Sequence, residues 1–146
     1  MINNGIILVP TDFSDHSVEA LKQACTLAPQ FESEVHLLHV ITTYSDFDAH
    51  FISTPQVSEM QRLQHESAIK RLADQARSVD MVISTHITDA LGDPAEAICD
   101  FAKELSANLI ITGRHNRQGA IEHLLIGSTA ERIVRLTPCS VLIAMP

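Results

Sequence analysis

GIILVP, residues 5–10, is an apolar run without polar alternation. A strand covered by helices on both faces of a parallel sheet has this composition, whereas a strand with one solvent-exposed face alternates apolar and polar residues. The run NLIIT, residues 108–112, has the same character. The sequence therefore predicts two central, fully covered strands at these positions.

Helical patterns separate these runs from three other strand-like segments. One long helix is expected to bury an apolar stripe that includes Met60, Leu63, Ile69 and Leu72. Asp93 followed by Pro94 is typical of a helix start, with an N-cap residue and proline at the first helical position. We expect strands at 5–10, 35–41, 81–88, 108–112 and 140–145, and helices at 14–29, at 56–78, from 93 and from 127.

This alternation of strands and helices indicates an α/β fold with right-handed crossovers. The segment 81–88 alternates polar and apolar residues, which favours an edge strand. We predict one domain, residues 1–146, with a doubly wound, Rossmann-like, five-stranded parallel sheet of order 3-2-1-4-5 and helices on both faces. Strands 1 and 4 would flank the topological switch point, where ligands of such sheets bind.

Composition narrows the class of function. The net charge of −8 argues against nucleic acid and anionic membrane as main partners. The three cysteines form no CxxC pair, no signal peptide opens the sequence, and a cytoplasmic location with reduced thiols is expected. His36 and His39 would point to opposite faces of a strand, and the other histidines have no ligand spacing, so no metal site is predicted.

The segment after strand 1 runs from Pro10 through Thr11, Asp12 and Phe13 to Ser14. It contains no GxGxxG, and the chain contains no GxxxxGK[ST], so neither a dinucleotide fingerprint nor an ordinary P-loop is present. Asp12 is either a ligand contact or a helix cap. Ser14 can cap the helix alone, which leaves Asp12 without an obvious structural task.

The segment after strand 4, ITGRHNRQGAIEHLLIGSTAER, spans residues 111–132. Gly113 permits close backbone approach to a ligand, and Gly127 precedes a helix whose free N–H groups favour an anion. Ser128 with Glu131 alternatively forms an S-x-x-E capping box. The neighbouring positive and imidazole side chains are Arg114, His115 and Arg117.

The joint spacing of these two segments resembles the universal stress protein family. That family has V-x-x-D-x-S at the end of strand 1, matched by residues 9–14, and G-x2-G-x9-G-[ST] after strand 4, matched by Gly113, Gly127 and Ser128. The stretches 92–94, 130–135 and 138–143 also resemble the family pattern. Asn116 replaces the middle glycine, and ten residues instead of nine separate it from Gly127.

The resemblance implies a cytosolic protein that binds ATP, with or without a Mg or Mn ion, as a regulatory ligand. No catalytic residue is assigned, and at most slow ATP hydrolysis is expected. The resemblance also implies a homodimer through residues 140–145. By this resemblance, Asp12 would contact adenine, beside Val40 or Ile41. The ribose would be lined by Pro10, Thr11 and Gly113. The phosphates would face Asn116, Gly127, Ser128 and Thr129, with charge added by Arg114 and His115.

A second hypothesis keeps the fold but leaves the site empty. Asn116 and the altered spacing favour it, and the chain would then act as a dimeric protein-interaction module. The segment 42–55 is long for a compact domain and is expected to anchor onto the following helix or to cover the site.

Overall fold

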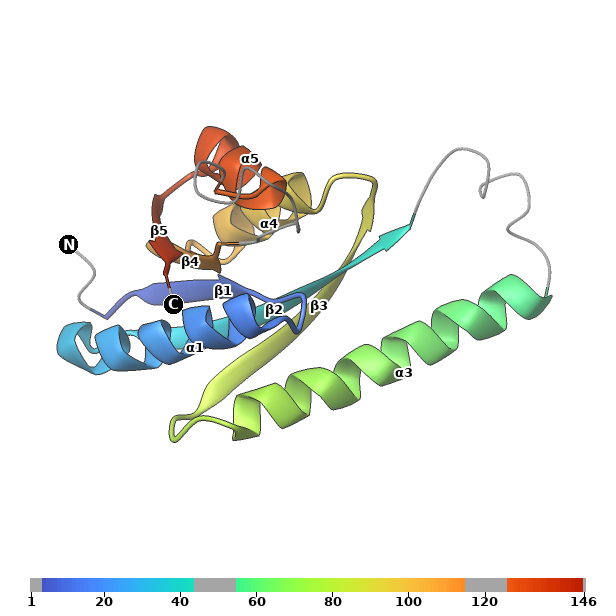
Figure 1. The fold of residues 1–146 in the computed structure, drawn as a ribbon, viewed down its shortest axis with the longest axis horizontal. Helices are drawn as coiled ribbons and strands as arrows, with labels where there is room; N and C mark the ends of the chain where they lie inside the picture. The colour runs from blue at the N-terminus through green and yellow to red at the C-terminus, as the bar shows by residue number, and fades with distance from the viewer. Residues whose placement is uncertain (1–3, 44–54, 115–125, 146) are drawn as a thin grey trace, which may run out of the picture.

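The computed structural model describes residues 4–43, 55–114 and 126–145. They form a parallel five-stranded sheet of order β3-β2-β1-β4-β5, which confirms the predicted fold (Figure 1). The strands are β1 (Ile6–Pro10), β2 (Glu34–Thr43), β3 (Ile83–Leu91), β4 (Leu109–Gly113) and β5 (Ser140–Ala144). The helices are α1 (Asp15–Leu27), α3 (Pro55–Arg77), α4 (Pro94–Glu104) and α5 (Ser128–Leu136), with a 3-10 turn, η1 (Ala28–Phe31), after α1.

The helices cover both faces of the sheet. Figure 1 shows α1 and α3 on one side and α4 and α5 on the other. Successive residues of β1 enter different cores, because Ile7 and Val9 pack with Leu21 of α1 whereas Leu8 packs with Ile98 of α4. This double burial explains the continuous apolar run, as predicted for a central strand.

The long helix α3 differs from its predicted packing. Met60, Leu63 and Ile69 were expected in a buried stripe, but their exposed fractions are 70 %, 50 % and 58 %. Leu72 of the same stripe is buried as predicted, and Ala68 and a glutamine described below are buried as well. Figure 1 shows a reason for Met60 and Leu63, since the N-terminal part of α3 runs beyond the ends of β1 and β4. Ile69 lies between the buried Ala68 and Leu72, so its side chain is on the outer face of the packed part of the helix.

The predicted helix starts are confirmed for two helices and wrong in detail for the third. Ser14 caps α1, and Asp93 caps α4 with its side chain accepting from the Ala95 N–H at 3.0 Å. For α5 the N-cap is Gly127, whose φ of 99° is readily adopted only by glycine, and no side-chain cap bond forms among the described residues. Ser128 is therefore already helical and cannot form the expected capping box. Glu131 bonds Arg135 at 2.7 Å instead.

No helix in the described ranges combines the length and apolar character needed to cross a membrane.

Candidate functional site

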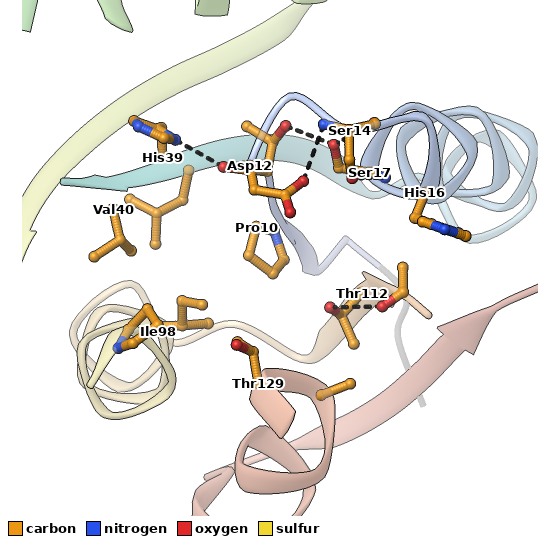
Figure 2. Close-up of a pocket in the computed structure, with 15 residues that line it drawn as sticks. Pro10, Asp12, Ser14, His16, Ser17, His39, Val40, Ile98, Thr112 and Thr129 are labelled. Atoms are coloured by element: carbon orange, nitrogen blue, oxygen red, sulfur yellow. Dashed lines mark hydrogen bonds between the residues drawn. The ribbon is translucent and has the colours of Figure 1, made fainter. Parts of the chain in front are cut away.

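A cavity of about 160 Å³ lies at the carboxyl ends of β1, β2 and β4, where the sheet order predicts a ligand site (Figure 2). Three helices begin beside it. Ser14 and Ser17 reach it from the start of α1, Pro94 from the start of α4, and Thr129 from the start of α5. Because the N-terminus of a helix carries partial positive charge, the cavity is suited to an anionic group.

The turn between β1 and α1 is held by hydrogen bonds centred on Thr11. This residue is buried, and its N–H donates to the Leu38 carbonyl at 2.8 Å. Its hydroxyl oxygen accepts from the Phe13 N–H at 3.0 Å and lies 3.0 Å from the Ser17 hydroxyl. Thr11 therefore lines the cavity as predicted, but it also organises the turn around its neighbour Asp12.

Asp12 lies in the cavity wall, and Figure 2 shows its carboxylate between Pro10 and Ser14. Its Oδ1 also accepts from the Ser14 N–H at 3.0 Å, so the expectation that it has no structural task is wrong. Ser14 caps α1 by accepting from the Ser17 N–H at 3.4 Å. The carboxylate thus closes a local turn while it remains exposed on the cavity side.

On the β2 side, the two residues proposed to flank a base separate. Val40 lines the cavity, whereas Ile41 is buried and lines a neighbouring cavity with Phe13 and Arg71. Val40 also borders that neighbouring cavity, so of the two proposed residues only Val40 reaches the candidate site. His39 also reaches the cavity, and its Nδ1 lies 2.8 Å from the Thr11 carbonyl oxygen.

On the β4 side, Gly113 lines the cavity and packs against the first turn of α1. A Cβ built on it would lie 2.5 Å from the His16 carbonyl oxygen, so a side chain has no room there. Arg114 follows directly, and its N–H donates to the Ala144 carbonyl at 3.4 Å. Its side chain is not among the groups that line the cavity.

The residues proposed to face phosphate are only partly brought together. Thr129 lines the cavity, whereas Gly127 and the exposed Ser128 lie just before it at the start of α5. His115 and Asn116 lie outside the described residues, as does most of the segment 42–55. Within the described residues, no group of three or more His, Cys, Asp and Glu side chains is placed to hold a metal ion.

Several lining residues were missed by sequence reasoning. The sequence offered one signal, since Asp93 and Pro94 mark a helix start and helix starts in this fold meet the ligand edge. No local pattern identifies Leu38 and Ile98, because their apolar side chains read simply as core. Together with Pro10 and Val40 they give the cavity an apolar wall in addition to its polar turn.

The comparisons with known proteins agree with this architecture. The model of the "Universal stress protein family" matches residues 3–144, so the chain belongs to that family. It is 32 % identical over 143 residues to a universal stress protein of Methanocaldococcus jannaschii, covering 94 % of this chain and 79 % of that one.

Solved structures show the same fold. A protein of the family from Burkholderia pseudomallei has a TM-score of 0.71 and 25 % identity, covering 96 % of this chain and 95 % of that one. The universal stress protein of Archaeoglobus fulgidus in complex with dAMP has a TM-score of 0.64 and 19 % identity, covering 99 % of this chain and 100 % of that one.

Proposed function

We propose that this chain is a single-domain, cytosolic universal stress protein that binds an adenine nucleotide, ATP above all, as a regulatory ligand. The observation that carries the proposal is the cavity at the switch point, where an apolar wall faces a carboxylate and three helix N-termini converge. An apolar slot suits a purine ring, and the helix N-termini suit phosphate. The relative from Archaeoglobus fulgidus was solved with an adenine nucleotide, dAMP.

The proposal assigns residues to each part of the nucleotide. Asp12 would accept from the adenine amino group beside Val40, and Pro10, Thr11 and Gly113 would line the ribose. The start of α5, including Thr129, would receive the phosphates together with Gly127, Ser128 and Asn116. Arg114 and His115 would add positive charge near them. A Mg or Mn ion would be held mainly by the phosphates.

The proposal also includes a homodimer through residues 140–145. β5 is an edge of the sheet, and Val141, Leu142 and Ile143 on it are only half-buried. An apolar edge strand is a natural site for pairing with a second copy. Sedimentation equilibrium tests this part: a dimer mass that becomes a monomer mass in Ile143→Lys supports it, and a monomeric wild type contradicts it.

The direct test is to denature the freshly purified protein and identify the released small molecules by mass spectrometry, alongside calorimetric titration with ATP and Mg²⁺. Asp12→Ala and Gly127→Val should abolish binding while circular dichroism stays that of the folded chain. Asp15→Ala is the matched control, because Asp15 is an exposed carboxylate three residues away, at the start of α1, that does not line the cavity.

No released nucleotide and no saturable heat would reject nucleotide binding. They would favour the second hypothesis, a dimeric interaction module with an empty site. Unchanged affinity in both Asp12→Ala and Gly127→Val would reject the assignment of the site.

A further inference from the structure

Phe13, next to Asp12, has an unusual backbone conformation. Its φ is 65°, in the left-handed region that disfavours aromatic residues. Such a conformation persists only where the surroundings hold it, and it often occurs at functional sites. Phe13 is followed by the N-cap Ser14, so its conformation sets the direction in which the chain enters α1.

Two side chains hold the Phe13 ring, one on each of two elements far apart in sequence. The imidazole of His39 on β2 lies 4.4 Å from the ring, centroid to centroid, at an interplanar angle of 32°. The guanidinium carbon of Arg71 on α3 lies 4.2 Å from the ring centroid. This distance is well within the range of a cation–π interaction. The Phe13 ring is thus fixed between β2 and α3.

A second contact from α3 holds the residue on the other side of Asp12. The Thr11 hydroxyl oxygen lies 2.8 Å from Gln75 Oε1, and both residues are buried, with exposed fractions of 5 % and 8 %. Gln75 is four residues after Arg71, so the two side chains leave the same face of α3. Asp12 therefore lies between two residues that α3 contacts.

Arg71 differs from the other two arginines of α3. Arg62 pairs with two glutamates of its own helix, and Arg77 pairs with an aspartate three residues before it. Arg71 has no carboxylate partner in the part of the chain that the structure describes, and its interaction there is with Phe13. The placement of its charge is therefore explained by the ring and not by a helix-surface ion pair.

We infer that Arg71 and Gln75 are positioning residues for the nucleotide site. Neither lines the cavity, but together they hold Phe13 and Thr11 so that the Asp12 carboxylate faces the ligand. This inference rests on the proposed nucleotide function. By this inference α3 affects the affinity for the nucleotide, although none of its residues lines the cavity and much of the helix is exposed.

The test measures ATP binding with Mg²⁺ by calorimetry in Arg71→Ala and Arg71→Lys. Loss of one cation–π interaction predicts a dissociation constant raised about tenfold in Arg71→Ala. Arg71→Lys should recover most of the affinity, because an ammonium group can also lie over the ring. Arg77→Ala is the matched control, because it removes an exposed arginine of the same helix that lies away from the ring. It should leave affinity unchanged.

A second measurement is amide hydrogen exchange over residues 11–17 without ligand. Exchange should be faster in Arg71→Ala and in Gln75→Met than in wild type and Arg77→Ala. Equal ATP affinity and equal exchange in Arg71→Ala and Arg77→Ala would overturn the inference, and so would the absence of recovery in Arg71→Lys. If the wild type binds no ATP, the proposed function fails on its own, and the exchange rates alone then decide the positioning role.

Discussion

Gly113→Ala tests how closely β4 and α1 approach at the site. The added Cβ would lie 2.5 Å from the carbonyl oxygen, 2.6 Å from the carbonyl carbon and 2.9 Å from the Cβ of His16. Favourable carbon contacts begin near ~3.5 Å, so the first turn of α1 must move by about 1 Å. Such overpacking costs roughly 1–3 kcal/mol. Alanine recovers ~0.5 kcal/mol by restricting the unfolded chain.

The expected net loss is about 0.5–2.5 kcal/mol of unfolding free energy. With a urea dependence of ~2 kcal/mol/M, the midpoint of unfolding should fall by ~0.3–1.2 M. Circular dichroism in urea measures it. His16→Ala should not rescue Gly113→Ala, because an alanine at position 16 keeps all three close atoms, the carbonyl oxygen, the carbonyl carbon and the Cβ. An unchanged midpoint in Gly113→Ala, or rescue in the double variant, would refute the reasoning.

Three further predictions concern groups outside the cavity. Ser106 follows α4 with a φ of 56° and the pair of backbone hydrogen bonds of a Schellman motif. Ser106→Gly should therefore raise the unfolding free energy by roughly 1 kcal/mol, whereas Ser106→Ala should not. The midpoints of urea unfolding of the two variants and the wild type measure the difference. Burial, and then the neighbouring His36, lower the pKa of His86 below its ordinary value of about 6.5. The unfolded chain then binds protons more readily, so stability should fall from pH 7 to pH 5, and a His86→Gln variant with the same slope would contradict this. Burial raises the pKa of the Cys99 thiol to about 11. Cys99 should therefore be the last cysteine that iodoacetamide alkylates at pH 8, measured by peptide mass spectrometry. Labelling of Cys99 before the other cysteines would contradict this.

The fold was predictable because its signals are local. Uninterrupted apolar runs marked β1 and β4, and their double burial is what excludes polar residues. Ser14 and Asp93 marked two helix starts, since capping depends on residue type within one turn of the chain. The sheet order then followed from chain connectivity, and with it the edge at which a ligand site lies.

The details of the site were less predictable because they depend on contacts between distant segments. His39 bonds the Thr11 carbonyl across 28 positions of sequence, and Arg71 reaches Phe13 from α3. The apolar stripe of α3 was only partly correct as a burial signal, since Leu72 is buried whereas Met60 and Leu63 are exposed. Periodicity shows which face of a helix is apolar, but not how far along it the sheet extends. Met60 lies on that face and is still 70 % exposed.

The three helices that the described residues bring to the cavity differ in how their first N–H groups are satisfied. Ser14 and Asp93 cap α1 and α4 with their own side chains, whereas Gly127 brings none to the start of α5. Unbonded N–H groups at a helix start require water or an anion. A serine at this cap would satisfy one of them, but the φ of 99° is readily adopted only by glycine. The geometry that requires glycine is therefore also the geometry that keeps the start of α5 available to phosphate, which is why Gly127, and not Ser128, should be the more sensitive position.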